Sequence, residues 1–351
     1  MKKHTTYFSI ALLLLALTSK SFAQPHRIAR GSVQRIRVHS RLLQGNLSRD
    51  SSDRYVSIYL PAGYSTHPNK HYPVVYFLHG YTDDDAKFYG LKKHWMVLPP
   101  ILDTVLAQDT TREMIFVTPD AYTLFQGSMY SNSVTTGDWE DFVAGELVGY
   151  IDRHYRTIAK KESRGICGHS MGGYGALRIG EKNPDVFSSV YLLSPCCLVS
   201  PPESEETLLP SYLRADSIRT IESFQKADFF TKALFASAAA WSPDPANPPF
   251  YLDLPVKDGK WQPQVLKKWD ANRPLNSLDQ YIYNIRQLKA IGFDAGDKDA
   301  GIAASIRTLD NELNRYGIRH SFEIYEGNHI DHIAQRMEKK MLQFFTKNLS
   351  F

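Results

Sequence analysis

Cysteine is scarce in this chain, and the few cysteines present do not suit disulfides. The 351 residues include three, Cys167, Cys196 and Cys197. An odd number with two adjacent residues is unlike the even, spaced pattern of a disulfide-stapled domain, and a bond between chain neighbours would be strained. Cys167 and Cys196 fall in or at the end of apolar, strand-like runs. We therefore expect small core residues rather than nucleophiles or metal ligands.

The chain also lacks an apolar run long enough to cross a bilayer comfortably. Its N-terminal apolar run, Phe8–Leu17, follows the positively charged Met1–Lys3 and precedes the small-residue site Ser21–Ala23. This order is typical of a secretory signal peptide, with an uncleaved anchor as the alternative. We expect residues 1–23 to be removed, which leaves a mature chain that starts near Gln24, has no membrane span and is secreted or periplasmic.

Net charge is the third quantity that is small. The expected signal peptide carries three of the 41 basic residues and none of the 37 acidic ones, so the mature chain has 38 against 37 and a net charge of +1. Such a balance gives no reason to expect nucleic acid or an anionic membrane as a partner. The 328 remaining residues fit one large domain, residues 24–351, better than two.

Short apolar runs alternate with helical patterns along this domain. Val33–Val38 and Tyr55–Leu60 alternate apolar and polar side chains, which predicts an antiparallel strand pair. Further strands are expected at Val74–Leu78, Met114–Val117, Gly165–Cys167, Val190–Leu193, Ala290–Asp294 and Phe322–Tyr325. Helices are expected at Ile101–Leu106, Glu140–Tyr155, Gly172–Gly180, Ile302–Tyr316 and Ile330–Phe345. The alternation predicts an α/β fold, with a mostly parallel sheet and helices on both faces.

The alternation breaks between residues 198 and 283. This stretch contains a helix-like segment, Ser223–Ala240, and the turn-rich Pro243–Pro249. We expect a lid-like insertion after the preceding strand rather than a second domain. Its aromatic side chains would either line a cleft or hold the lid together: Phe229, Phe230, Trp241, Phe250 and Tyr251.

The pentapeptide Gly168–Gly172 lies between a strand-like and a helix-like run. This setting is typical of a nucleophile elbow, in which a serine sits on a sharp strand-to-helix turn and small flanking residues allow close backbone approach. Ser170 would be the nucleophile. Gly172, Gly173 and Gly175 would each weaken an ordinary helix, so their use here predicts close packing of the helix on the sheet.

A serine hydroxyl needs a base to take its proton and a carboxylate to orient that base. His329 follows the last expected strand and Asp299 follows the one before it. Ser, Asp and His, each after a strand, occur in the order that α/β-hydrolases use. The alternatives are His332 as the base and Asp294 or Asp297 as the acid.

The developing oxyanion needs two backbone N–H donors. One should come from Met171, directly after the serine. The second should come from Tyr81, because the loop His79–Tyr81 follows a strand and contains a glycine. We expect the side chain of His79 to pack or bond locally rather than to take part in the chemistry.

The elbow is one of several motifs that occur in a fixed order and together span most of the chain. They are Tyr59–Tyr64, Tyr72–Gly80, Ser128–Ser133, Gly137–Glu140, Gly168–Leu177, Gly296–Asp299 and Gly327–His329. With them the chain resembles the "putative esterase" family, which includes esterase D-like enzymes, feruloyl esterase domains, siderophore esterases and mycolyltransferases. The resemblance implies the α/β-hydrolase fold, with nucleophile Ser170, acid Asp299, base His329 and oxyanion donors Tyr81 and Met171. Asn328 departs from the glycine that often stands there in the family, and His332 follows where an aromatic residue is common.

Other polar and aromatic residues have two interpretations. Tyr130, Asn132 and Trp139 belong either to a substrate wall beside the oxyanion hole or to a packed, hydrogen-bonded loop. Asp299, His329 and His332 resemble a metal cluster only loosely, because their spacing is not that of a zincin. We expect no metal and no cofactor.

The sequence therefore predicts a secreted serine esterase that forms an acyl-enzyme. The family resemblance and the signal peptide favour a carbohydrate ester, feruloyl or acetyl, or another small-molecule ester as substrate. The enzymatic alternatives are acyl transfer to a sugar acceptor, a siderophore esterase and an S-formylglutathione hydrolase, the last of which suits cytoplasmic relatives better. A catalytically silent binding module is the non-enzymatic alternative. Neither the oligomeric state nor the natural acyl group follows from the sequence.

Overall fold

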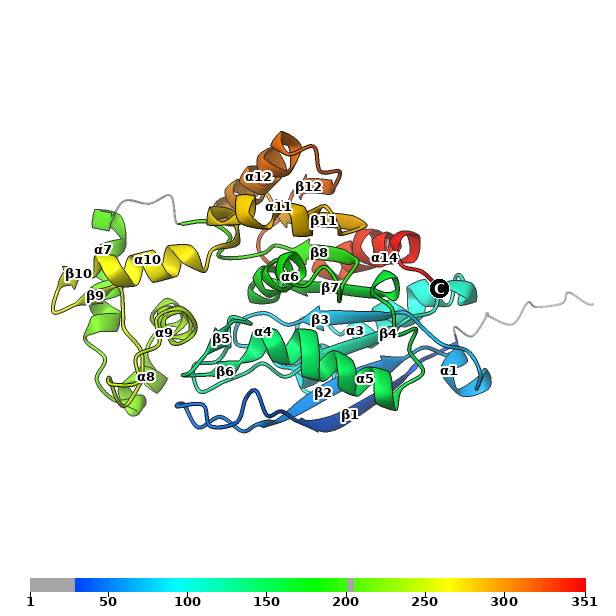
Figure 1. Ribbon diagram of the computed structural model, residues 1–351, viewed down its shortest axis with the longest axis horizontal. Helices are drawn as coiled ribbons and strands as arrows, with labels where there is room; N and C mark the ends of the chain where they lie inside the picture. The colour runs from blue at the N-terminus through cyan, green and yellow to red at the C-terminus, as the bar shows by residue number, and fades with distance from the viewer. Residues whose placement is uncertain (1–28, 201–204) are drawn as a thin grey trace, which may run out of the picture.

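An eight-stranded sheet forms the centre of the molecule (Figure 1). A computed structural model describes residues 29–200 and 205–351. The expected signal peptide, residues 1–23, lies outside the described residues. Along the sheet the strand order is β1-β2-β4-β3-β7-β8-β11-β12. The first two neighbour pairs are antiparallel and all the others are parallel, as the alternation of elements predicted.

The strand bounds agree closely with the apolar runs of the sequence. The sheet consists of β1 (Ser32–His39), β2 (Asp53–Leu60), β3 (Val74–Leu78), β4 (Ile115–Pro119), β7 (Arg164–His169), β8 (Ser189–Leu193), β11 (Ala290–Gly296) and β12 (Ser321–Tyr325). Two hairpins lie outside it: β5 (Asn132–Ser133) with β6 (Gly137–Asp138), and β9 (Val256–Lys257) with β10 (Lys260–Trp261). The expected antiparallel strand pair is confirmed as β1 and β2.

Helices cover both faces of the sheet. The elements around it are α3 (Leu98–Leu106), α4 (Trp139–Asp141), the π-helix Phe142–Leu147, α5 (Val148–His154), α6 (Met171–Lys182), α12 (Ala300–Arg315), α13 (Ile333–Arg336), the π-helix Met337–Met341 and α14 (Leu342–Asn348). Alternate residues of β3 belong to different apolar clusters. Tyr76 packs in a cluster with side chains of α5 and α6, and Phe77 packs in a second cluster with side chains of α3 and α14. This alternation is the period-two geometry of a strand buried on both sides.

The segment expected to form one C-terminal helix from Ile330 begins later, at Ile333. Asn328 is the reason, because its Oδ1 accepts hydrogen bonds from the backbone N–H groups of Ile330 (3.0 Å) and Asp331 (3.1 Å). Such a side-chain turn competes with helix formation. His332 then adopts a left-handed conformation with φ 60° before the helix starts. Ile330 is consequently 46% exposed rather than part of the apolar face.

Among the described residues, five α-helices lie in the connection from β8 to its neighbour β11. They are α7 (Glu205–Asp216), α8 (Ile221–Lys226), α9 (Phe229–Trp241), α10 (Pro263–Ala271) and α11 (Ile282–Ile285). The expected helix Ser223–Ala240 is in fact two, because Asp228 caps a new helix by accepting the N–H of Thr231 (3.0 Å). Helices α7 to α10 lie beyond one end of the sheet, at the left of Figure 1. Within the described residues no helix is both long and apolar enough to cross a membrane.

Helix α6 approaches the sheet through its glycines. A Cβ on Gly172 would lie 1.9 Å from the carbonyl oxygen of Leu78 in β3, and one on Gly168 would lie 2.4 Å from the carbonyl carbon of Gly172. Gly175 leaves similar room for the ring of Tyr130. The prediction of close helix–sheet packing is confirmed, and it explains why glycine is used despite its cost in a helix.

This approach makes a stability prediction. Gly172→Ala should lower the free energy of unfolding by about 3 kcal/mol or prevent folding, because the methyl group meets backbone atoms that cannot move aside. Gly301→Ala is the matched control, since Gly301 also lies in a helix but has open space at its Cβ. It should gain about 0.5–1 kcal/mol. Urea unfolding measures both, and equal midpoints for the two variants would contradict the close contact.

Candidate functional site

Three polar side chains meet at one edge of the sheet. Ser170 follows β7, Asp299 follows β11 and His329 lies on the loop after β12. These strands are parallel, so their carboxyl ends point to the same edge. Loops at this edge are where open α/β sheets place their sites.

The three side chains form a chain of hydrogen bonds. His329 Nε2 lies 2.9 Å from Ser170 Oγ, and His329 Nδ1 lies 2.6 Å from Asp299 Oδ2. An ionised carboxylate only accepts, so Nδ1 carries the hydrogen and Nε2 presents its lone pair to the serine hydroxyl. The His329 side chain is 37% exposed and that of Asp299 is 18% exposed. The arrangement can therefore transfer a proton from Ser170 to an oriented, solvent-accessible base.

The backbone at Ser170 is strained and firmly held. Its φ of 57° and ψ of −117° lie outside the regions that non-glycine residues favour. Its N–H donates to the carbonyl of Leu193 (3.0 Å), and its carbonyl accepts from the N–H groups of Tyr174 (3.0 Å) and Cys196 (3.2 Å). These contacts offset the strain and present Oγ at the top of the sheet, as a nucleophile elbow does.

The alternative acids and the alternative base have other contacts. Asp294 is fully buried and accepts hydrogen bonds from Arg336 Nε (3.0 Å), Arg336 Nη2 (2.9 Å) and the Tyr191 hydroxyl (2.7 Å). Burial raises the pKa of Asp294 to about 6, although Arg336 opposes the shift. Asp297 accepts the backbone N–H of Gly327 (3.0 Å).

His332 lies with its ring 6.3 Å from that of Tyr325, edge to face. Asp299, and not Asp294 or Asp297, is thus the carboxylate hydrogen-bonded to His329, and His329, not His332, is hydrogen-bonded to Ser170. Both ring nitrogens of His329 are engaged in these bonds. In the loose cluster of Asp299, His329 and His332, the imidazole of His329 therefore has no nitrogen left to bind a metal ion while these bonds are made. Among the described residues no group of three or more His, Cys, Asp and Glu side chains could hold a metal ion.

The two backbone amides predicted to form the oxyanion hole make no hydrogen bond within the described residues. Within the described part of the chain, neither the N–H of Tyr81 nor that of Met171 has a hydrogen-bond partner. The side chains of both residues meet at Gly127, where an added Cβ would lie 2.8 Å from Tyr81 Cδ2 and 2.7 Å from Met171 Sδ. Tyr81 thus lies next to the residue that directly follows Ser170, as the predicted oxyanion hole requires.

His79 holds the loop that carries Tyr81. Its Nε2 accepts the N–H of Ala121 (2.8 Å), so its Nδ1 must carry the hydrogen that is donated to the carbonyl of Gly80 (2.9 Å). The ring is fully buried and stays away from solvent. His79 therefore bonds locally, as the sequence analysis expected of its side chain.

Burial excludes two of the three expected substrate-wall residues. Tyr130 is 0% exposed and donates its hydroxyl to the carbonyl of His79 (3.1 Å), and Trp139 is 1% exposed. Asn132 is exposed, but its Oδ1 accepts the N–H groups of Glu140 (3.0 Å) and Asp141 (3.2 Å). The packed-loop interpretation therefore fits these residues, and the substrate-wall interpretation was wrong for Tyr130 and Trp139.

Exposed aromatic residues that the sequence analysis did not assign to the site lie beside it instead. Phe229 of α9 is 54% exposed and packs edge to face on Tyr81, with ring centroids 5.4 Å apart. Phe230 is 71% exposed and packs on Phe229. Trp95 is 44% exposed and packs on His169, the residue before the serine. The sequence flagged the two phenylalanines as candidates only through their place in the insertion, and Trp95 carried no signal.

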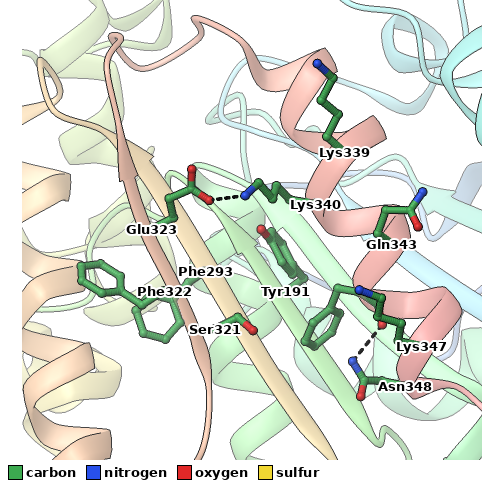
Figure 2. A pocket seen from close by; sticks show the side chains of 11 residues that line it. Tyr191, Phe293, Ser321, Phe322, Glu323, Lys339, Lys340, Gln343, Lys347 and Asn348 are labelled. Carbon is green, nitrogen blue, oxygen red and sulfur yellow. Dashed lines mark hydrogen bonds and ion pairs between the residues drawn. The ribbon is translucent and has the colours of Figure 1, made fainter.

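The cavity shown in Figure 2 is separate from these residues. It has a volume of about 270 Å³ and lies between β12 and α14. Lys340 at its rim pairs with Glu323 (2.7 Å). Neither Ser170 nor any residue hydrogen-bonded to it lines this cavity.

All three cysteines are free.

His169 makes stability depend on pH. Burial, followed by the neighbouring His329, lowers the pKa of His169 from 6.5 to about 4. Between pH 4 and pH 6.5 the unfolded chain binds more protons at this histidine than the folded chain does. The free energy of unfolding therefore rises as the pH increases through this range and falls on acidification. The shift corresponds to about 3 kcal/mol between pH 7 and pH 4. Urea unfolding at pH 7 and pH 4 should show a larger loss of unfolding free energy on acidification in the wild type than in His169→Gln. An equal loss in the two proteins would contradict the prediction.

Comparison with solved structures shows the same fold. A ferulic acid esterase matches with a TM-score of 0.62 and 20% identity, over 92% of this chain and 99% of that one. An S-formylglutathione hydrolase from Agrobacterium tumefaciens matches with 0.59 and 16%, over 94% and 99%. A ferulic acid esterase from Anaeromyces mucronatus, in complex with ferulic acid, matches with 0.53 and 18%, over 93% of each chain. These likenesses place the chain in the α/β-hydrolase fold.

The family follows from the sequence itself. The family model described as "Putative esterase" matches residues 49–332, which include the elbow, the loop of Tyr81 and the loops of Asp299 and His329. The match covers well over half of the chain. The protein therefore belongs to the putative esterase family and is a hydrolase of esters with the α/β-hydrolase fold.

Proposed function

We propose that this protein is a serine esterase that works through an acyl-enzyme. The hydrogen-bonded chain Ser170–His329–Asp299 carries the proposal. Ser170 Oγ attacks the ester carbonyl carbon while His329 Nε2 takes its proton, and Asp299 holds the imidazole and stabilises its positive charge. The backbone N–H groups of Tyr81 and Met171 stabilise the oxyanion.

Collapse of the tetrahedral intermediate completes the first half of the reaction. The bond to the alcohol oxygen breaks, His329 returns its proton to that oxygen, and the acyl group remains on Ser170. Water then attacks the acyl-enzyme, with His329 as the base for the incoming water and as the acid for the departing Ser170. The exposed edge of His329 gives water access for this step.

For the substrate we propose an ester between an acyl group and a carbohydrate, with feruloyl or acetyl as the acyl group. The ferulic acid esterases among the similar structures support this choice. So does the exposed aromatic surface of Trp95, Phe229 and Phe230, which suits a flat acyl group or a sugar ring. The signal peptide expected at residues 1–23 would place the enzyme outside the cytoplasm, where such esters occur. The connection between β8 and β11 would act as the lid-like insertion.

A substrate panel separates this proposal from its alternatives. Methyl ferulate, acetylated xylan, an aryl acetate, a siderophore ester and S-formylglutathione would be compared. Activity confined to S-formylglutathione would contradict the carbohydrate ester and favour the activity of the Agrobacterium relative. Product analysis with added acceptor sugars would reveal acyl transfer in place of hydrolysis.

Substitution of the proposed nucleophile and base tests the chemistry. Ser170→Ala and His329→Ala should each lower kcat/KM for an aryl acetate by about ten-thousandfold or more, because each removes a group that acts in the transition state. His332→Asn is the matched control, since asparagine tolerates the left-handed backbone of His332. It should stay within about threefold of wild type. Wild-type hydrolysis by Ser170→Ala would overturn the proposal.

Substitution in the exposed aromatic surface of Trp95, Phe229 and Phe230 tests the choice of acyl group. Phe229→Ala should raise KM for a cinnamoyl or feruloyl ester by about tenfold, because one ring contact is lost. KM for the matching acetate should change little, since the methyl group of an acetyl ester is too small to contact this aromatic surface. Tyr283→Ala is the control, because Tyr283 is an exposed aromatic residue (78%) of α11 that contacts Arg286. Equal effects of Phe229→Ala on both esters would contradict an acyl-binding role.

A further inference from the structure

His169 connects the two loops that carry the proposed nucleophile and base. It is the last residue of β7, directly before Ser170, and its side chain is buried with 3% exposure. Its Nε2 lies 3.0 Å from the backbone carbonyl oxygen of His329. A carbonyl oxygen only accepts hydrogen bonds, so Nε2 must carry a hydrogen. The contact is thus a directed bond from the elbow to the main chain of His329.

Two aromatic rings enclose the His169 ring. The His329 ring lies 4.9 Å away at an angle of 42°, and the Trp95 ring packs edge to face at 5.6 Å. Burial and the nearby His329 keep the pKa of His169 at about 4, although Asp83 and Asp299 act in the opposite direction. At neutral pH the ring is therefore uncharged. With Nε2 protonated, Nδ1 is left as a lone pair that has no partner among the described residues.

The neighbours of His329 are fixed from elsewhere. Asp297 holds the N–H of Gly327, and the side chain of Asn328 holds the N–H groups of the next two residues after His329. These contacts shape the turn, but they all belong to the β11 and β12 loops. The bond from His169 is different, because it ties this turn to the strand that carries Ser170. It therefore bears on the distance between His329 Nε2 and Ser170 Oγ.

We propose that His169 is a positioning residue, which holds the main chain of His329 against the elbow so that the imidazole stays within hydrogen-bond reach of Ser170 Oγ. This proposal rests on the serine esterase function proposed above. Because the tether acts on the backbone carbonyl of His329, it does not depend on the protonation of the imidazole. Because His169 is neutral, it adds no positive charge beside that imidazolium. A small displacement of a catalytic group suffices to slow a reaction strongly.

Two substitutions separate the tether from simple packing. His169→Gln keeps an N–H donor near the position of Nε2, whereas His169→Phe keeps an aromatic ring and removes the donor. With an aryl acetate as substrate, His169→Phe should lower kcat by about 10- to 100-fold with KM nearly unchanged, because the base is misplaced while substrate contacts remain. His169→Gln should stay within about threefold of wild type, since the donor is retained.

A second histidine provides the matched control. His320 also bonds to a backbone carbonyl (Nδ1 to Ile318 oxygen, 2.8 Å) and stacks on an aromatic ring, that of Phe293, but it lies at the opposite end of β12. His320→Phe should cost stability without lowering kcat of the folded enzyme. Thermal unfolding of every variant shows that the assayed protein is folded.

The outcomes are distinct. Wild-type kcat in His169→Phe, or equal losses in His169→Phe and His169→Gln, would overturn the tether. Ser170→Ala, assayed in parallel, separates this result from failure of the proposed function. Loss of activity in Ser170→Ala with unchanged kcat in His169→Phe would contradict the tether alone. Wild-type activity in Ser170→Ala would contradict both, because the hydrolysis would then not use this site.

Discussion

The close contact between helix α6, which follows Ser170, and the sheet governs the geometry of this molecule. Gly168 and Gly172 allow the backbone of α6 to approach the end of β3 to a distance that no side chain would permit. The turn between β7 and α6 is consequently sharp, and Ser170 occupies its strained corner. The carbonyl of Leu193 and the N–H groups of Tyr174 and Cys196 hold this corner in place. The strain is thus supported by the sheet on one side and by the helix on the other.

The loops of Asp299 and His329 depend on a second, buried anchor. Asp294 of β11 pairs with Arg336 of α13, and Arg336 also pairs with Glu323 of β12 through Nη1 (2.8 Å) and Nη2 (2.9 Å). This network joins two strands to the helix that follows them. The loop of His329 lies between β12 and α13, so both of its ends are fixed. Asp294 is thus a structural carboxylate, although it belongs to the same strand that leads to Asp299.

Much of the fold and the central part of the site could be predicted from sequence, because both depend on local patterns. Apolar runs identify strands, and the position of a residue after a strand identifies the sheet edge on which it lies. The sequence analysis chose Asp299 over Asp294 and Asp297 from its place after a strand and from the family resemblance, but the physical reason for the choice is visible only in the structure. All three lie close together in sequence, and their roles differ through partners that are distant in the chain, such as Arg336 and Gly327.

Residues beyond the hydrogen-bonded chain were predicted poorly, because their exposure depends on packing between distant segments. Tyr130 fills the space left by Gly175, and Trp139 is buried with its indole N–H on the carbonyl of Thr136 and its ring against Phe142. Phe229, which packs on Tyr81, is the first residue of the helix that Asp228 caps. The exposed aromatic side chains of Phe229 and Phe230 therefore belong to the connection between β8 and β11, whose path the alternating pattern of strands does not specify.

Hydrogen bonding distinguishes the roles of His79, His169 and His329. His79 accepts at Nε2 from a backbone N–H and must donate from Nδ1 to a carbonyl, so its protons are fixed by fully buried partners. His169 donates from Nε2 to a carbonyl and is kept neutral by burial. His329 alone of these three combines a carboxylate at one nitrogen, a hydroxyl at the other and an edge exposed to water. In the proposed mechanism, the proton of Ser170 would thus pass to the one imidazole of the three that is hydrogen-bonded to a carboxylate.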